Sequence, residues 1–225
     1  MEHTRAEYLQ RLNEVNLYFS TFKVLDNSSC TLESVDIAGN HQSLPINSDL
    51  VKIIKANGFI LLYNLIEATV RNSVTAVLNS IEVEQVTYKM VTDEMRKLWI
   101  KQELKSIKEI DTIRLKVHSL LSKVLDDAIF SLSSECVTIS GNIDAQEIRN
   151  ISKQIGCSEP RDGSPLFQIK NKRNELAHGE KTFCEIGKDF TIQDLIRCKE
   201  ETTNFLETVI ANMENYISSK GFLRN

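Results

Sequence analysis

Glycine and proline are scarce in this chain, whose 225 residues contain eight glycines, three prolines and 41% apolar residues. Both residue types interrupt regular secondary structure, so their scarcity favours helices over an all-β or loop-rich fold. The five cysteines are odd in number and far apart, and none forms a CxxC pair. A disulfide framework or a zinc cluster is therefore not expected, and the pattern is typical of a reducing cytoplasm.

The motifs of several common chemistries are also missing. The chain has no GxxxxGK[ST] loop, no GxGxxG after a strand, no GxSxG elbow and no HExxH pair. Nucleotide hydrolysis, dinucleotide redox chemistry and α/β-hydrolase chemistry therefore lack support, and we expect no metal or other cofactor. The first residues, MEHTRAEYLQRL, form no apolar signal segment, and charges spread along the chain argue against a membrane-spanning helix.

The formal net charge of −4 argues against broad, non-specific nucleic-acid binding, although it leaves room for a local basic site. The periodicity of the apolar residues predicts one all-α domain over residues 1–225, a helical bundle. Residues 26–47 lack this periodicity and predict a long connector, which could hold a short β-hairpin around Gly39. Helices are predicted at 4–23, 48–81, 92–107, 111–132, 144–155, 164–178 and 194–219, with a brief strand at 136–139 and a turn at 181–190.

The segment RNELAHG, Arg173 to Gly179, ends one of these helices and is the most informative in the chain. Arg173 is a permanent cation, and His178 follows five residues later with a side chain that titrates near neutrality. Such a pair suits chemistry on a phosphodiester, because the arginine can stabilise phosphate charge while the histidine moves a proton. Asn174 lies one turn before His178, directly beneath it on the helix.

Arg173 stands where a packing residue would be expected. Leu166, Ile169 and Leu176 recur at helical spacing as one apolar seam, and Arg173 occupies a position within it. A guanidinium there requires a carboxylate, a phosphate or water. Two interpretations stay open: an arginine paired to a buried glutamate, with His178 as a helix cap, or a polar site that binds a phosphate.

The second predicted helix offers a candidate partner for the arginine. Asn57, Asn64 and Arg71 repeat every seven residues along it, and Glu67 lies one turn before Arg71. One interpretation is a satisfied buried network or the solvent-facing edge of the helix. The other makes Glu67 the carboxylate that holds either Arg173 or Arg71 in position.

RNELAHG resembles the signature of the HEPN superfamily, all-α domains found largely in bacterial conflict systems, in which four to six residues separate an arginine from a histidine. Residues 50–74 and 140–156 and the last helix are similar to one prokaryotic branch of that superfamily. The resemblance implies an HEPN-like bundle that is a metal-independent endoribonuclease, active as a homodimer whose two Arg–His motifs meet across the interface. Some members have lost the motif and only bind.

From this resemblance we expect a cytoplasmic ribonuclease of toxin or antiviral-defence type that acts on RNA, with an antitoxin or a defence-system protein as a further partner. Arg173, Asn174 and His178 are the expected catalytic residues, and Lys170 and Lys172 are expected to attract the RNA backbone. Glu67 and Arg71 are expected to support them. The alternative is a non-catalytic HEPN module that binds RNA or a protein partner.

Overall fold

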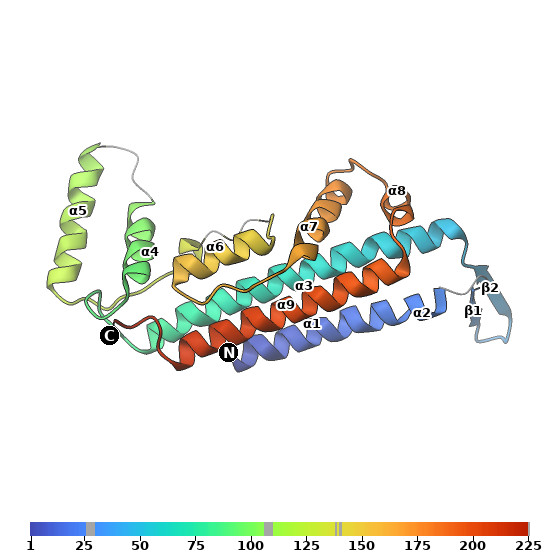
Figure 1. Cartoon of the computed structure of the whole chain (residues 1–225), viewed down its shortest axis with the longest axis horizontal. Helices are drawn as coiled ribbons and strands as arrows, with labels where there is room; N and C mark the ends of the chain where they lie inside the picture. Colours follow the sequence, from blue (N-terminus) through green and yellow to red (C-terminus); the bar gives the residue numbers. More distant parts are fainter. Residues whose placement is uncertain (26–29, 106–109, 138, 140, 225) are drawn as a thin grey trace. The chain divides into compact units, whose positions relative to one another are not determined.

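The computed structural model describes residues 1–25, 30–105, 110–137, 139 and 141–224. Helices account for most of these residues, which confirms the prediction of an all-α protein (Figure 1). In chain order the elements are α1 (Glu2–Ser20), α2 (Phe22–Leu25), β1 (Thr31–Val35), β2 (His41–Pro45), α3 (Ser48–Val83), α4 (Asp93–Leu104), α5 (Ile110–Leu125), the 3₁₀ turn η1 (Ser134–Cys136), α6 (Ala145–Ile155), α7 (Ser164–Ala177), α8 (Phe183–Lys188) and α9 (Ile192–Ser218).

The chain divides into two compact units, each of which is described by itself. Unit 1 comprises Met1–Arg5, Glu67–Asp162 and Phe205–Asn225, and unit 2 comprises Ala6–Ile66 and Gly163–Asn204. The helices α1, α3 and α9 contribute residues to both units because their sequences cross these boundaries. A single domain over residues 1–225 stays a prediction.

In unit 2, the first half of α3 packs against α1 and against the start of α9. The rings of Phe19 on α1 and Phe22 on α2 meet edge to face at 4.9 Å, and both are buried. Phe59 of α3 meets the ring of Phe190, which precedes α9, at 4.8 Å. The Lys55 ammonium donates a hydrogen bond to the Phe190 carbonyl, so the same stretch of α3 holds the entry to α9.

The β-hairpin predicted around Gly39 is present in unit 2. Strands β1 and β2 pair antiparallel, with Thr31 opposite Pro45 and Val35 opposite His41. The Asp36 carboxylate closes the turn because it accepts hydrogen bonds from the backbone of Ala38 and Asn40, at 2.9 and 2.8 Å. Residues 26–29 of the predicted connector lie outside the described residues.

In unit 1, α4 and α6 contribute buried side chains to the core, together with the second half of α3 and the end of α9. Trp99 of α4 stacks on Phe130 with a ring separation of 6.1 Å. The Tyr216 hydroxyl of α9 donates to the carbonyl of Ile155, the last residue of α6, at 2.7 Å. Arg5 forms ion pairs with the carboxylates of Glu207 and Glu214, at 3.1 and 2.8 Å.

Two predicted elements in unit 1 are wrong. The helix expected at 111–132 ends at Leu125, because Asp127 adopts a left-handed φ of 48° that no α-helix continues. The strand expected at 136–139 is not formed, since Cys136 ends the 3₁₀ turn η1; residue 138 lies outside the described residues. His118 and most of the α5 side chains that the structure describes are exposed, although the apolar residues around His118 (LKVHSLL) favour a buried segment.

The segment predicted as a turn at 181–190 contains α8, and this prediction is wrong. Thr182 caps the helix by accepting from the Glu185 backbone, while the Glu185 side chain accepts from the Thr182 backbone. This reciprocal capping box satisfies donors that a short helix would otherwise leave unpaired. Its Thr-x-x-Glu pattern was readable in the sequence.

Helix α3 is long and apolar enough, by length and composition alone, to cross a membrane. The exclusion of a spanning helix from the sequence was therefore too strong. Half of the most apolar window of α3 is buried inside the protein, and the core helix of a water-soluble bundle meets the same criterion. The absence of a membrane partner stays a prediction.

Candidate functional site

Helix α7 carries the Arg–His motif and belongs to unit 2. Its first helical residue is Ser164, as predicted, Gly163 holds the capping position, and Pro165 lies in the first turn. The predicted seam is present, since Leu166, Ile169 and Leu176 are all buried. The opposite face is exposed and includes Phe167, which is 60% accessible.

Arg173 lies half-buried at the edge of this seam, and its guanidinium stacks on an aromatic ring. The guanidinium carbon is 4.5 Å from the ring centre of Tyr63, a completely buried residue of α3. A planar, weakly hydrated guanidinium is well suited to such a face, and the contact is worth roughly 0.5–2 kcal/mol. The seam position of Arg173, where a leucine would be expected, is therefore packed by the contact of the guanidinium with the Tyr63 ring.

The amide of Asn174 orients the same guanidinium. Nη1 of Arg173 donates to Oδ1 of Asn174 at 3.0 Å. Asn174 lies one turn before His178, so this bond links the guanidinium to a residue on the face of α7 that carries the histidine. The structure thus brings Arg173 and Asn174 together, while the Cα–Cβ directions of Arg173 and His178 lie about 140° apart around the helix.

His178 is the C-cap of α7, and its side chain is exposed. Its backbone N–H still donates to the Asn174 carbonyl at 2.9 Å. Beyond it, Gly179 has a φ of +69°, and the Glu180 N–H returns to the Glu175 carbonyl at 2.9 Å. This is the Schellman ending, in which a left-handed residue reverses the chain, and it confirms Gly179 as the predicted stop of the helix.

Glu175 ties the segment after His178 back to the helix. Its carboxylate accepts from Lys172 at 2.9 Å and pairs with Lys181 at 3.2 Å. Partial burial alone would raise the pKa of Glu175, but the hydrogen bonds and charges of the two lysines outweigh it and lower that pKa. The hydrogen bond to Glu175 raises the pKa of Lys181 in turn.

The predicted substrate lysines are therefore placed differently from one another. Lys172 is engaged with Glu175, whereas the Lys170 ammonium lies 4.9 Å from the centre of the exposed Phe167 ring. Glu67 forms an ion pair with Arg71 at 2.8 Å, one of the two pairings expected for it. Both of these residues belong to unit 1, and their support of Arg173 stays a prediction.

Tyr63 is the residue of the site that the sequence analysis missed. Tyr63 lies one turn before Glu67 on α3, the helix on which only Glu67 and other polar residues were predicted to support the site. Guanidinium groups stack on aromatic faces, but the sequence gives no local signal for this contact, because it depends on which helices pack together. Within the residues that the structure describes, no three His, Cys, Asp or Glu side chains gather as ligands for a metal ion.

Comparison with known proteins gives the class of this chain. The sequence model of the MAE_28990-like HEPN family matches residues 6–222. The chain therefore belongs to this HEPN family, which confirms the predicted membership of the HEPN superfamily. HEPN domains include ribonucleases and also non-catalytic members. No curated protein and no solved structure matches the chain.

Proposed function

We propose that this chain is a metal-independent endoribonuclease of toxin or antiviral-defence type. One observation carries the proposal: the Arg173 guanidinium is hydrogen-bonded to Asn174, which lies one turn before the exposed His178 on α7. A fixed cation beside an accessible imidazole provides phosphate binding and proton transfer together. Membership of the HEPN family supports this assignment, because ribonucleases occur in it.

The reaction proposed is transfer of a phosphodiester to the neighbouring ribose hydroxyl. The 2′-oxygen attacks phosphorus and loses its proton to a histidine, the bond to the 5′-oxygen breaks, and that oxygen takes up a proton. The products are a cyclic 2′,3′-phosphate and a free 5′-hydroxyl. His178 acts as the general base or acid, and Arg173 stabilises the charge that builds on the phosphate oxygens.

The polar neighbours of the pair have supporting roles. Asn174 orients the guanidinium and can donate its own amide N–H to a phosphate. Lys172, Glu175 and Lys181 together carry a net charge of +1, two lysines less one glutamate, so pairing does not remove their attraction for RNA. Lys170 adds a further cation on the exposed side of the helix.

We further propose that the active form is a homodimer with a composite site. Arg173 and His178 are five residues apart, which places their Cα–Cβ directions about 140° apart around the helix. One helix therefore presents the arginine and the histidine to different sides. A second copy of α7 could supply the partner histidine on the far side of the same phosphate, so that one imidazole removes a proton and the other delivers one.

The test is RNA cleavage by purified protein in EDTA. Arg173→Ala and His178→Ala should each slow cleavage by about 10²–10⁴-fold, the usual effect of removing such groups. Arg114→Ala and His118→Ala are the matched controls, because these residues form another arginine and histidine pair on the exposed helix α5. Wild-type products should carry cyclic phosphate ends, and cleavage undiminished in both α7 variants would end the proposal.

The competing function is a non-catalytic HEPN module that binds RNA or a protein. The stacking of Arg173 on Tyr63 and the pairing of Lys172 with Glu175 favour it, because both contacts also stabilise the fold by themselves. Growth after induced expression separates the two functions. A nuclease should slow growth, and Arg173→Ala should relieve the effect. RNA binding without any cleavage, equal in wild type and variant, would favour the module.

A further inference from the structure

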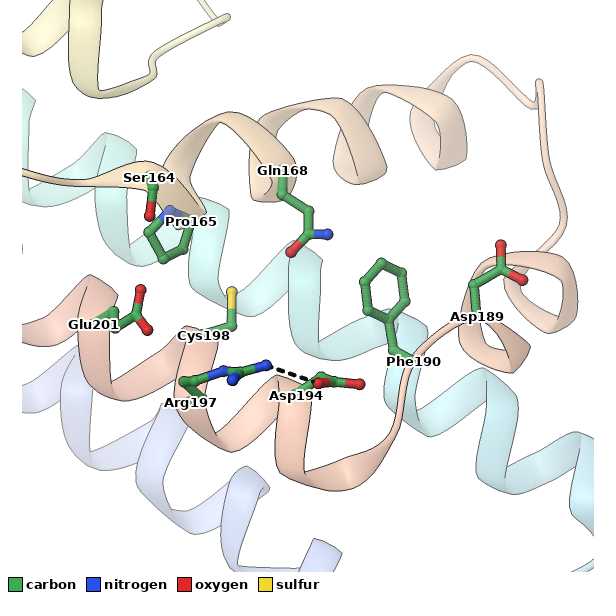
Figure 2. A pocket seen from close by; sticks show the side chains of 9 residues that line it. All are labelled: Ser164, Pro165, Gln168, Asp189, Phe190, Asp194, Arg197, Cys198 and Glu201. Atoms are coloured by element: carbon green, nitrogen blue, oxygen red, sulfur yellow. Dashed lines mark hydrogen bonds and ion pairs between the residues drawn. The ribbon is translucent and has the colours of Figure 1, made fainter.

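A cavity of about 500 Å³ lies between the first half of α7 and the first turns of α9, within unit 2. Figure 2 shows its nine lining residues: Ser164, Pro165, Gln168, Asp189, Phe190, Asp194, Arg197, Cys198 and Glu201. The volume falls in the range of small-molecule sites. Gln168 lies five residues before Arg173 and therefore about 140° around α7 from it, so the cavity occupies a different face of the helix from Arg173.

The charge of this cavity is predominantly negative. Three carboxylates and one guanidinium line it. Asp194 is already engaged, since it accepts from the backbone and hydroxyl of Thr191 and pairs with Arg197 at 3.0 Å. Arg197, the one cation among the lining residues, is therefore already paired with a carboxylate of the protein.

Two carboxylates remain for a ligand. Within the described part of the chain, the side chains of Asp189 and Glu201 have no hydrogen bond or ion pair. Figure 2 shows them at opposite ends of the cavity, with Gln168 above and Phe190 between them. The Gln168 amide oxygen and the Ser164 hydroxyl provide further acceptors along the same opening.

The middle of the cavity is apolar. Phe190 is held by its edge-to-face contact with Phe59, and Pro165 provides a second hydrocarbon surface. Figure 2 shows the sulfur of the buried Cys198 pointing from α9 toward α7. Burial raises the pKa of Cys198 to about 12, so this thiol is protonated and uncharged at neutral pH.

We propose that this cavity binds a small aliphatic dication of the polyamine type. Each ammonium end would pair with one of the two available carboxylates, Asp189 or Glu201, and the methylene chain between them would lie on Phe190 and Pro165. Phosphate groups would be repelled by the same carboxylates, so RNA is not the ligand here. The proposal goes beyond ribonuclease activity and does not depend on it.

The experiment is calorimetric titration of the full chain with spermidine, with the ionic strength held constant. We expect saturable binding, about two- to fivefold weaker in Asp189→Asn and in Glu201→Gln, and lost in the double variant, since an ion pair to an exposed carboxylate is worth up to about fivefold in affinity. Glu200→Gln is the matched control, because Glu200 is the exposed neighbour of Glu201 and lies outside the cavity lining. Circular dichroism and a thermal melt establish that each variant is folded.

Two outcomes would overturn the proposal. The first is absence of saturable binding, or equal affinity in wild type and the double variant. The second is tighter binding of a Gly-Arg-Gly peptide than of spermidine, lost in the same double variant, because the cavity would then take a basic side chain of another protein. RNA cleavage by wild type is measured separately, so a failure of the ribonuclease proposal does not affect this result.

Discussion

The C-terminal ends of α6 and α7 share one backbone ending but use it differently. In α6, Gly156 has a φ of +81° and the Cys157 N–H returns to the Ser152 carbonyl at 2.9 Å. In α7, Gly179 has a φ of +69° and the Glu180 N–H returns in the same way. Both helices therefore end in a Schellman motif.

The residue before the glycine makes the difference. Ile155 in α6 is completely buried, and its carbonyl accepts from the Tyr216 hydroxyl. His178 in α7 is exposed. A helix ending buried in a core contributes stability, whereas the same ending at a surface holds a side chain in a defined place where a substrate can reach it. The stop signal in the sequence is the same, and burial decides its use.

The largest expected effect is on stability at the buried end. Ile155→Ala should lower the free energy of unfolding by about 2–5 kcal/mol, because it removes a fully buried side chain and leaves a cavity. His178→Ala should change it by less than about 0.5 kcal/mol, since the side chain is exposed. Urea denaturation of both variants measures the change in the free energy of unfolding. A large loss of stability in His178→Ala would give the histidine a structural role.

The two glycines offer a sharper comparison. Gly156→Ala and Gly179→Ala should each cost about 1–2 kcal/mol, because alanine is strained at a positive φ. The cost should be similar, since an added methyl group meets nothing closer than 3.4 Å at Gly156 and nothing within 4 Å at Gly179. Only Gly179→Ala should also slow RNA cleavage, because it displaces the chain that follows His178. Equal cleavage by both variants would contradict this division of roles.

A smaller effect is expected from Glu175, which tethers the end of α7. Glu175→Gln should cost about 0.5–1 kcal/mol at neutral pH, because two lysines lose a partially exposed partner. The folded-state pKa of Glu175 is lowered, so its contribution is present above its ordinary pKa of 4.5 and is lost as the pH falls through the lowered value. Denaturation of wild type and variant should therefore differ at pH 7 and converge in acid.

Lys153 and Glu159 provide the control at the end of α6. This ion pair of 3.4 Å also spans the helix ending, but its side chains are 62% and 39% exposed. Lys153→Gln should leave the unfolding free energy unchanged within about 0.5 kcal/mol at any pH. A pH-dependent loss in this variant equal to that of Glu175→Gln would mean that overall charge, rather than the tether on α7, determines the effect.

Much of the fold could be predicted from local patterns. Asp144 and Gly156 bound α6 as expected, because capping and left-handed glycine are properties of a few neighbouring residues. The end of α5 and the exposure of His118 could not be predicted in this way. Apolar periodicity identifies the helix, but the neighbours against which α5 would pack are set by tertiary structure.

The site could be predicted only in part, because some of its residues are close in sequence and others are not. Arg173, Asn174 and His178 are close in sequence, so helical geometry alone placed Asn174 beside the arginine and one turn before the histidine. Tyr63 belongs to α3, far away along the chain, and no local pattern connects it to Arg173. Its contact depends on the packing of two helices, which side-chain spacing within either helix does not specify.

The most direct test of the central claim compares single and double variants of the motif. Single-turnover cleavage rates of a labelled RNA are measured in EDTA for Arg173→Ala, His178→Ala and the two changes combined. If the arginine and the histidine act as one unit, the double variant should be no slower than the slower single variant. Multiplied losses in the double variant would show that the two residues act separately, and wild-type rates in all three would remove α7 from the chemistry.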